Sequence, residues 1–369
     1  MASRRLKKES VTVTATTPYE VRVESDLDLK AAVSETLKPG TAVLLTDSNV
    51  GPLYATFVEK VLKEAGWDLA DDVLTVPAGE ASKSLSVYEG VVRRLARAKT
   101  PRGATLFALG GGVVGDLGGF VASSYARGIN LVQLPTSLLA MVDSSVGGKV
   151  GLDLPEGKNL IGAFLQPRLV AANLDWLDTL PPHEISYGLA EVVKMGLLTG
   201  GEFFEDLKRS LAHARAGDTE ALQTLILHSV RAKAVVVTED EREAGVRAIL
   251  NYGHTVGHGL EAAAGYDLPH GEAVAVGMLA AARLSRESFG TDLLATHEDL
   301  LRAASLPLKV SAVEVKRVLD AMGRDKKRFA SDAVGEYRFV LLEDVGRPVR
   351  DVPVSTDEAR RVIGDVLGP

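Results

Sequence analysis

The chain contains no cysteine, which excludes disulfide bonds, thiolate metal ligands and a cysteine nucleophile. Any bound metal ion must therefore be held by histidine, aspartate or glutamate. An excess of basic residues is also lacking, because 42 Lys and Arg face 49 Asp and Glu, giving a formal net charge of -7. A general nucleic-acid-binding protein needs a net basic surface, so no nucleic-acid partner is expected.

No apolar run approaches the roughly 20 residues that a membrane-spanning helix requires. The longest, residues 273–284, is interrupted by Gly277. The basic residues 1–10 are followed by alternating Val and Thr, not by the continuous apolar core of a signal peptide. We therefore expect a cytoplasmic protein with no membrane partner.

The composition that remains is that of a folded protein long enough for two domains. Of the 369 residues, 46% are hydrophobic and 25% are charged, both ordinary values for a globular chain. In the first half, short β-rich runs alternate with helical patterns, which indicates a largely parallel sheet. These runs are 41–46, 73–76, 104–109 and 130–134.

Strand signals largely stop at Leu180-Pro181-Pro182, and helical patterns follow one another. The predicted helices are 184–198, 219–238, 255–264 and 271–289. A late β-like pair, 337–342 and 348–352, precedes a last helix capped by Ser355. The sequence thus predicts an α/β Rossmann-like domain over 1–180 and an otherwise all-α domain over 181–369.

A glycine-rich segment follows one predicted strand directly and opens a helix. It reads Gly110-Gly111-Gly112-Val113-Val114-Gly115-Asp116 and matches the dinucleotide-binding pattern, in which the backbone approaches a pyrophosphate at a helix N-terminus. Tight strand-to-helix turns use the same residues for packing, so both interpretations stay open. The next strand ends in Leu134-Pro135-Thr136, without the acid expected at a ribose. Asp47 and Glu80, after two other strands, are our candidates for a ribose or adenine contact.

Three of the seven histidines, His254, His258 and His270, lie in one short stretch. His254 and His258 are four residues apart, so on a helix they share a face and their rings can converge on one ion. Ordinary packing histidines are the alternative. Glu191 is the best carboxylate candidate, because its helix is apolar and also carries Lys194; a buried acid and base need a partner or a metal. The alternative is a solvated Glu–Lys pair.

Basic residues also recur within glycine- or asparagine-bearing loops of this acidic chain. Such cations fit a small anionic substrate with a phosphate or carboxylate group, although some will be ordinary surface charges. They are Arg127, Lys149, Lys158, Lys233, Arg247 and the pair in Asp325-Lys326-Lys327.

In combination, these motifs resemble the 3-dehydroquinate synthase family of sugar phosphate cyclases over about residues 41–342. Each is long, and all occur in the family's order. The motifs that carry the resemblance are Gly79-Glu80-x-x-Lys83, 110–116, Pro135-Thr-Ser-Leu-Leu-Ala140, 142–149, Lys158-Asn-Leu-Ile-Gly-Ala-Phe164, 188–194, 247–258 and Arg324-Asp-Lys-Lys327.

The resemblance implies an N-terminal Rossmann-like domain, a helical C-terminal domain, an active site in the cleft between them, and a homodimer. It implies NAD and a divalent zinc or cobalt ion as cofactors, with the metal on Glu191, His254 and His270 while His258 faces the substrate. The implied NAD-site residues are Asp47, Glu80, Lys83, Gly112, Val113, Val114, Gly115, Asp116, Thr136, Ser137, Lys149, Lys158 and Thr179. The implied substrate and catalytic residues are Asp143, Lys149, Asn159, Lys194, Lys233, Arg247, Asn251, His258 and Lys326, with Arg127 reaching in from a second subunit.

The implied reaction converts a sugar phosphate, 3-deoxy-D-arabino-heptulosonate 7-phosphate, to 3-dehydroquinate and phosphate. Oxidation by NAD, phosphate elimination, return of the hydride and an intramolecular aldol step follow one another, so the cofactor ends unchanged. Small departures from the family pattern include Ser137, Met141, Asp153 and Gly259. The alternatives are an amino-dehydroquinate synthase, another sugar phosphate cyclase, a NAD- and metal-dependent polyol dehydrogenase, or a scaffold that only binds nucleotide.

Overall fold

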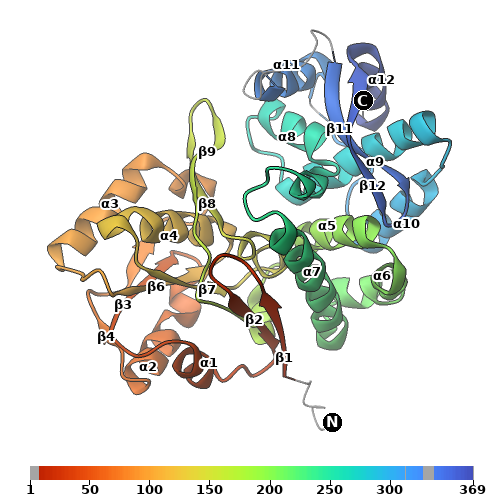
Figure 1. Ribbon diagram of the computed structural model, residues 1–369. Helices are drawn as coiled ribbons and strands as arrows, with labels where there is room; N and C mark the ends of the chain where they lie inside the picture. The colour runs from red at the N-terminus through yellow and green to blue at the C-terminus, as the bar shows by residue number, and fades with distance from the viewer. Residues whose placement is uncertain (1–7, 312, 327–335, 369) are drawn as a thin grey trace. The chain divides into compact units, whose positions relative to one another are not determined.

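The computed structural model describes residues 8–311, 313–326 and 336–368, with the side chains of 324–326 left out (Figure 1). The chain divides into two compact units. The first is Met1–Pro181 together with Lys233–Arg242, and the second is Pro182–Ala232 together with Glu243–Pro369. The domain limits 1–180 and 181–369 stay a prediction, and no feature of the sequence indicated that 233–242 packs with the first unit.

The first unit is built on one sheet in the order β1-β2-β10-β7-β6-β3-β4, with β5 also paired to β3. Every pairing is parallel except that of the edge strand β1 with β2. The parallel α/β fold predicted from the sequence is thereby confirmed. The strands are β1 Glu9–Val13, β2 Tyr19–Glu24, β3 Thr41–Asp47, β4 Asp68–Leu69, β5 Leu74–Val76, β6 Thr105–Gly110, β7 Asn130–Pro135 and β10 Leu169–Asn173.

Helices cover both faces of this sheet, because strands buried on both sides need two apolar layers. On one face, α1 (Leu29–Thr36) and α2 (Thr56–Glu64) insert their apolar stripes over β3, β6 and β7. On the other face, α3 (Leu85–Arg97) and α4 (Gly112–Ser124) do the same. Both layers are visible in Figure 1. The carboxyl ends of the strands, where α4 begins directly after β6, form the edge at which parallel sheets bind ligands.

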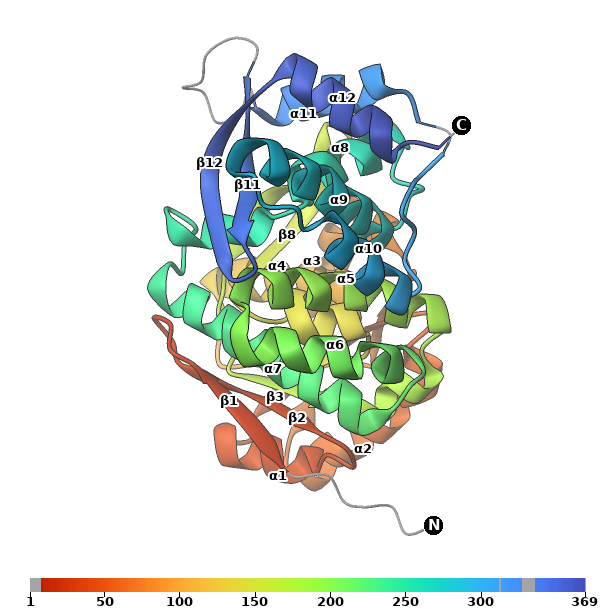
Figure 2. The ribbon, with the colours of Figure 1, turned by 90° about the vertical axis from the view of Figure 1, so that its right-hand side faces the viewer.

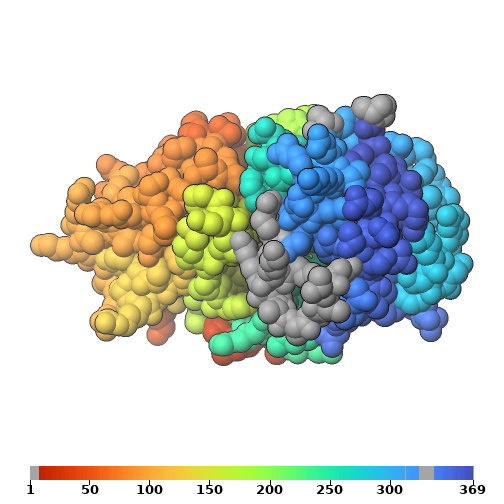
Figure 3. Space-filling view, turned by 90° about the horizontal axis from the view of Figure 1, so that it is seen from above, coloured from red at the N-terminus to blue at the C-terminus, as the bar shows by residue number. Residues whose placement is uncertain are grey.

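A β-hairpin and short helical turns complete the first unit. Strands β8 and β9 pair antiparallel, and β8 packs on α4. The hairpin, in yellow-green, lies on the surface seen in Figure 3. These elements are β8 Lys149–Leu154, β9 Gly157–Phe164, η1 Gly51–Ala55, η2 Glu80–Ser82, η3 Tyr125–Arg127, η4 Ala140–Ser144 and η5 Leu174–Thr179.

The second unit is mainly helical, as the sequence predicted. Its elements are α5 Pro182–Thr199, α6 Gly201–Arg215, α7 Thr219–Glu239, η6 Val246–Asn251, α8 His254–Ala263, α9 His270–Phe289, α10 Leu294–Ala303, α11 Val315–Lys326, β11 Glu336–Asp344, β12 Arg347–Ser355 and α12 Thr356–Val366. The last turns of α7 belong to the first unit. The late β-like pair forms the antiparallel hairpin β11–β12, and Ser355 caps α12 together with Glu358.

Helix α9 is the centre of this unit. It contacts α5, α8, α10, α12 and β11 (Figure 2). All residues of 273–282 are buried, which explains why this stretch is the longest apolar run: it is the core of a helical unit. In the part of the chain that the structure describes, no helix is long and apolar enough to cross a membrane.

Small residues allow neighbouring elements to pack closely, and Gly119 in α4 is a clear case. A Cβ at this position would overlap the side chain of Val150 in β8, at 2.9 Å from its Cβ. Gly90 in α3 is a matched contrast, because a Cβ there meets no atom within 4 Å. The first glycine is required by packing, whereas the second is not.

We expect Gly119→Ala to lower the free energy of unfolding by about 1–3 kcal/mol, because Val150 is a short branched side chain that cannot move away freely. Gly90→Ala should raise it by about 0.5–1 kcal/mol, because alanine restricts the unfolded chain and favours helix. Denaturant unfolding of both variants measures these changes. Equal effects of the two substitutions would contradict the packing account.

A buried histidine anchors α10 to the segment before α8. His297 is 0% exposed; its Nδ1 lies 2.7 Å from the carbonyl oxygen of Leu293, and its Nε2 lies 2.8 Å from the hydroxyl of Tyr252. The carbonyl can only accept, so Nδ1 carries the proton and Nε2 accepts from Tyr252. Burial lowers the pKa of His297 to about 4, so the ring is neutral at neutral pH.

This depressed pKa makes part of the stability depend on pH. The contribution is fully present above about pH 6.5, where histidine is neutral in both states, and is lost as the pH falls towards 4 because only the unfolded chain takes up the proton. Between pH 8 and pH 5 the loss should be about 2 kcal/mol. Denaturant unfolding of wild type and His297→Gln at both pH values tests this. Between pH 8 and pH 5 the free energy of unfolding of the variant should fall by about 2 kcal/mol less than that of wild type. An identical pH dependence would show that His297 titrates normally.

Candidate functional site

Helix α5 buries a carboxylate in an apolar helix interface. Glu191 is 1% exposed, and Lys194, one turn further on, is 2% exposed and forms an ion pair with Oε2 of Glu191. Burial of two charges is costly unless further partners surround them. Within the described residues, neither carboxylate oxygen of Glu191 accepts a hydrogen bond. Helix α5 therefore holds a buried carboxylate that is ion-paired but lacks the hydrogen bonds that buried carboxylates normally accept.

Two histidines from other helices point to the same carboxylate. His254 begins α8 and His270 begins α9. Nε2 of His254 lies 3.5 Å from Oε1 of Glu191, and Nε2 of His270 lies 3.4 Å from the same oxygen. One ligand atom from each of the three residues falls within 4.8 Å of the others. The three residues thus surround one point with two nitrogens and a carboxylate.

Close backbone contact between helices makes this convergence possible. A Cβ on Gly277 of α9 would collide with the carbonyl oxygen of Gly253, the residue before α8. A Cβ on Gly271 would collide with the backbone of Tyr187 in α5. Because the three helices meet nearly backbone to backbone, side chains as short as His and Glu can reach one another.

The electrostatics of the cluster follow from its burial. Burial opposes ionisation of Glu191, but Lys194 and the imidazoles outweigh it and hold the pKa of Glu191 well below its usual value. Burial and the charge of Lys194 lower the pKa of His254 well below its ordinary value, so its ring is neutral. Burial also disfavours charge on His270, yet the carboxylates of Glu191 and Glu261 raise its pKa to about 10.

This donor set fits a divalent transition metal. Two imidazoles and one carboxylate are the ligands found at catalytic zinc sites, where a fourth position is left for substrate or water. A cation at this point would also coordinate the buried oxygens of Glu191, which accept no hydrogen bond within the described residues. The residues present therefore suit the metal that the sequence motifs imply.

His258 does not join this cluster. It is exposed, and the set of ligand atoms to which it belongs includes Glu261 and His270 but not Glu191. The spacing of four residues does place the rings of His254 and His258 side by side, with centroids 5.1 Å apart. The expectation from spacing alone, that these two rings converge on a single ion, differs from the geometry, in which His254 shares Glu191 with His270. Glu261 carried no prediction from the sequence.

The predicted substrate-binding residues of this unit lie on several elements. Arg247, on η6, is 1% exposed. Asn251 ends the same turn, and its amide lies 3.4 Å from Glu243. Lys326 is the last residue of α11, and its side chain lies outside the described part of the structure. The roles of these residues stay predictions.

In the first unit, the predicted nucleotide-site residues gather at the carboxyl ends of β3, β6 and β7. Asp47 ends β3, and its Oδ1 accepts hydrogen bonds from the backbone N–H of Asn49 and Val50. The N–H of Thr136, after β7, donates to the carbonyl of Gly110 at 3.0 Å. A Cβ on Gly111 or Gly112 would come within 3.3 and 3.1 Å of the hydroxyls of Ser137 and Ser144.

The N-terminus of α4 lies at the centre of this edge. Its N-cap residue, Gly111, makes no side-chain hydrogen bond, and the first N–H groups of any helix have no partner within the helix. Gly112, Val113 and Val114 form its first turn. A glycine-rich strand end, followed by an uncapped helix N-terminus, fits the pyrophosphate of a dinucleotide. Packing also requires some of these glycines, since a Cβ on Gly115 would contact Gln133 at 2.9 Å.

A buried lysine links several of the predicted residues. Lys83, 4% exposed, donates to Asp116 at 2.8 Å and to the side-chain oxygen of Asn159 at 2.6 Å. Glu80 lies 3.6 Å from Lys83 and 3.5 Å from Lys158. Burial opposes the charge on Lys83, but Asp116 and Glu80 outweigh it and raise its pKa.

Asp153, noted in the sequence only as a departure from the family pattern, belongs to this network as well. Its carboxylate accepts the N–H of Asn159 at 2.7 Å, and its own N–H donates to the carbonyl of Lys83 at 2.7 Å. Asn159 has a positive φ of 54°, which this bonding offsets. The hairpin β8–β9 is therefore fastened to the loop after β5.

The remaining predicted residues of this unit are more dispersed. Lys233 donates to the carbonyl of Asp143 at 2.7 Å and forms an ion pair with its carboxylate. Lys149 and Arg127 are exposed, and Arg127 has a positive φ of 68°. Thr179 shares a hydrogen bond of 2.7 Å with the hydroxyl of Tyr54.

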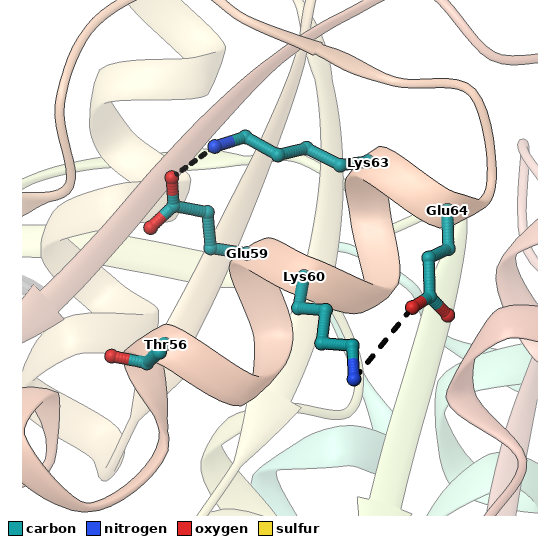
Figure 4. A pocket seen from close by; sticks show the side chains of 5 residues that line it. All are labelled: Thr56, Glu59, Lys60, Lys63 and Glu64. Carbon is teal, nitrogen blue, oxygen red and sulfur yellow. Dashed lines mark hydrogen bonds and ion pairs between the residues drawn. The ribbon is translucent and has the colours of Figure 1, made fainter.

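A surface hollow along α2 has none of this chemistry. Thr56, Glu59, Lys60, Lys63 and Glu64 line it (Figure 4). Lys63 pairs with Glu59 at 2.6 Å and Lys60 with Glu64 at 3.8 Å, one helical turn apart in each case. Such exposed pairs contribute a few tenths of a kcal/mol to a helix. The hollow is therefore a charged helix surface and not a candidate site.

Comparison with known proteins gives one consistent result. Models of the 3-dehydroquinate synthase N-terminal and C-terminal regions match residues 73–187 and 188–328. A 3-dehydroquinate synthase of Acidithiobacillus ferrooxidans is 46% identical over 325 residues, which cover 86% of this chain and 87% of that protein.

Two solved structures are also similar. One is a 2-deoxy-scyllo-inosose synthase complexed with carbaglucose-6-phosphate, NAD+ and Co2+, with a TM-score of 0.89 and 27% identity over 97% of this chain and 100% of that one. The other is ValA, a 2-epi-5-epi-valiolone synthase from Streptomyces hygroscopicus with NAD+ and Zn2+ bound, with a TM-score of 0.84 and 25% identity over 99% of both chains. The site geometry, the matched models and these relatives agree that the chain belongs to the 3-dehydroquinate synthase family.

Proposed function

We propose that this protein catalyses the 3-dehydroquinate synthase reaction with NAD and one divalent metal ion, zinc or cobalt. In this reaction, 3-deoxy-D-arabino-heptulosonate 7-phosphate gives 3-dehydroquinate and phosphate, a step of aromatic amino acid biosynthesis. The observation that carries the proposal is the convergence of Glu191, His254 and His270 on one point, in a chain that belongs to this family.

The metal belongs on these three residues. Two of them, Glu191 and His254, are buried, and His270 is partly so, which keeps bulk water from competing for the ion. When both cofactors are bound, NAD accepts and later returns a hydride, and the cation polarises the reacting oxygen. The protein itself then orients the substrate and balances its charge.

Buried cations suit an anionic substrate. Lys194, Lys233 and Arg247 are 2%, 6% and 1% exposed. Lys194 and Lys233 are each held by a carboxylate, of Glu191 and Asp143. In our proposal these cations and Arg247 attract a ligand with phosphate and carboxylate groups. A neutral polyol would not use them, which argues against the polyol dehydrogenase alternative. In our proposal Lys149, Asn159 and Lys326 also bind the substrate, and Asn251 and His258 take part in proton transfer.

The NAD site lies, in our proposal, at the carboxyl ends of β3, β6 and β7. The uncapped start of α4 would receive the pyrophosphate, because its N–H groups and helix dipole favour an anion. Asp47, Thr136 and Ser137 would contact the rest of the dinucleotide. Glu80, Lys83, Asp116 and Lys158 would support it from the charged network around Lys83.

We also propose a cytoplasmic homodimer. Arg127 supports the dimer, because it is exposed and is held with positive φ, a conformation that rarely persists without a reason. In a dimer it would reach the substrate bound by the second subunit. Light scattering of the purified protein measures the subunit number, and a monomer at working concentration would exclude this role.

Phosphate release tests the proposed reaction. Purified protein supplied with Co2+ or Zn2+, catalytic NAD and 3-deoxy-D-arabino-heptulosonate 7-phosphate should release one phosphate per substrate. Mass spectrometry should identify 3-dehydroquinate, and no NADH should accumulate, because the hydride returns to the product. Steady NADH formation from simple polyols, without phosphate release, would instead support a dehydrogenase. Turnover only of an amino sugar phosphate would support the amino-analogue synthase.

His254→Ala should reduce metal content after dialysis to near zero and abolish turnover, because it removes one of three ligands. The fold should persist, since the side chain lies at the start of α8 and not in the apolar core. Elemental analysis and circular dichroism measure both properties. His213→Ala, on the exposed face of α6, is the matched control and should keep its metal. Full metal content in His254→Ala would remove this residue from the ligand set.

A further inference from the structure

One face of α8 carries three chemical groups, and one of them has no role in the function proposed so far. His254, His258 and Glu261 are spaced at i, i+4 and i+7, which places them on a single stripe of the helix. Glu261 is 1% exposed. A carboxylate buried to this extent requires a specific partner.

That partner includes His270, which lies between two carboxylates. Its Nε2 is 3.4 Å from Oε1 of Glu191, and its Nδ1 is 3.3 Å from Oε2 of Glu261. An imidazole that coordinates a cation is neutral: it binds the ion through the lone pair of one nitrogen and carries its proton on the other. An ionised carboxylate can only accept, so Glu261 selects the form with the proton on Nδ1. The lone pair then lies on Nε2, on the side of Glu191.

The other histidine of the cluster is held in the same way. Nδ1 of His254 lies 3.1 Å from the carbonyl oxygen of Tyr252, and its Nε2 faces Oε1 of Glu191. Both rings therefore bond an acceptor through Nδ1 and present Nε2 to the same point. Tyr252 is fixed in turn by its hydroxyl contact with His297. Only the acceptor differs: a neutral carbonyl for His254 and a charged side chain for His270.

We propose that Glu261 is a positioning residue for His270, which fixes the ring orientation and the proton on Nδ1 so that Nε2 is directed to the metal. This inference rests on the metal role proposed for Glu191, His254 and His270. Carboxylates in such a second layer also make the imidazole a stronger donor, and their loss typically lowers metal affinity 10–100-fold.

A second possible metal site includes both Glu261 and His270. The ligand atoms of His258, Glu261 and His270 also lie within 4.8 Å of one another, so Glu261 would be a ligand if a cation occupied that point. The first set is favoured because it contains two buried residues and because the oxygens of Glu191 accept no hydrogen bond within the described residues. The two arrangements predict different metal contents and different affinities for the Glu261 variants.

The test compares Zn2+ affinity, by chelator competition, in wild type, Glu261→Gln and Glu261→Ala. Glutamine can still accept from Nδ1 but lacks the charge, so Zn2+ should bind about 10-fold more weakly, and alanine should approach 100-fold. The Co2+-loaded variants should keep one ion per chain, with a shifted visible spectrum. Glu272→Gln is the matched control, because Glu272 is only two residues from His270 but bonds Tyr187. Its affinity and spectrum should equal those of wild type.

Three results would overturn the inference. Equal affinity and spectra of wild type and Glu261→Gln would show that Glu261 does not orient His270. Complete loss of one ion in Glu261→Gln, equal to the loss in His254→Ala, would make Glu261 a ligand. If wild type itself binds no Zn2+ or Co2+ tightly, the proposed function fails and this inference fails with it. Thermal melting of Glu261→Gln shows whether the variant is folded. If it is folded, a change in its metal binding cannot be attributed to unfolding, and the three outcomes can be told apart.

Discussion

The arrangement of the helical unit depends on keeping Glu191 ionised away from water. Removing a carboxylate from solvent is costly, and the structure offsets that cost with Lys194 on the same helix and with two imidazoles from α8 and α9. These groups are short, so the helices must approach very closely. Gly271 and Gly277 permit the approach, and the apolar residues of α9 hold it. The close packing of these helices and the clustering of Glu191 with its partners therefore depend on the same residues.

The first unit, for which we propose the NAD site, has a different physical requirement. A pyrophosphate needs backbone N–H groups rather than a buried charge, and parallel strands followed by helices present such groups at one edge. A group of buried and half-buried charges lies beside this edge, where Lys83 joins Glu80, Asp116 and Asp153. The same lysine also holds Asn159 of the β8–β9 hairpin. A single buried cation therefore links the edge for which we propose the nucleotide site to a strand pair beyond the sheet.

Much of this architecture was predictable from the sequence, because its signals are local. The strands that became β3, β5, β6 and β7 are short apolar runs before turns, and the capping of α12 by Ser355 follows from residue type. The family motifs also named Glu191, His254 and His270, which the structure brings to one point, and their role as metal ligands stays a prediction. The helical spacing of His254 and His258 identified a common face, but spacing within one helix cannot show which ring meets a residue from another helix.

What escaped prediction depends on contacts between segments distant in sequence. Glu261 reads as an ordinary helical glutamate, and only the packing of α8 on α9 brings it to His270. Asp153 reads as a substituted motif position, and its role requires Lys83, far earlier in the chain. Residues 233–239 continue a helix of the second unit, yet 233–242 pack with the first. Periodicity carries no information about such pairings.

The positions of the three clustered residues in the chain have a consequence for the order of assembly. Glu191, His254 and His270 begin or occupy three different helices, and no two of these helices contain the complete set. During synthesis the chain therefore cannot form the site until the start of α9 has been made and has docked. If the cluster holds a metal ion, as we propose, the ion can bind all three residues only after α5, α8 and α9 have packed together.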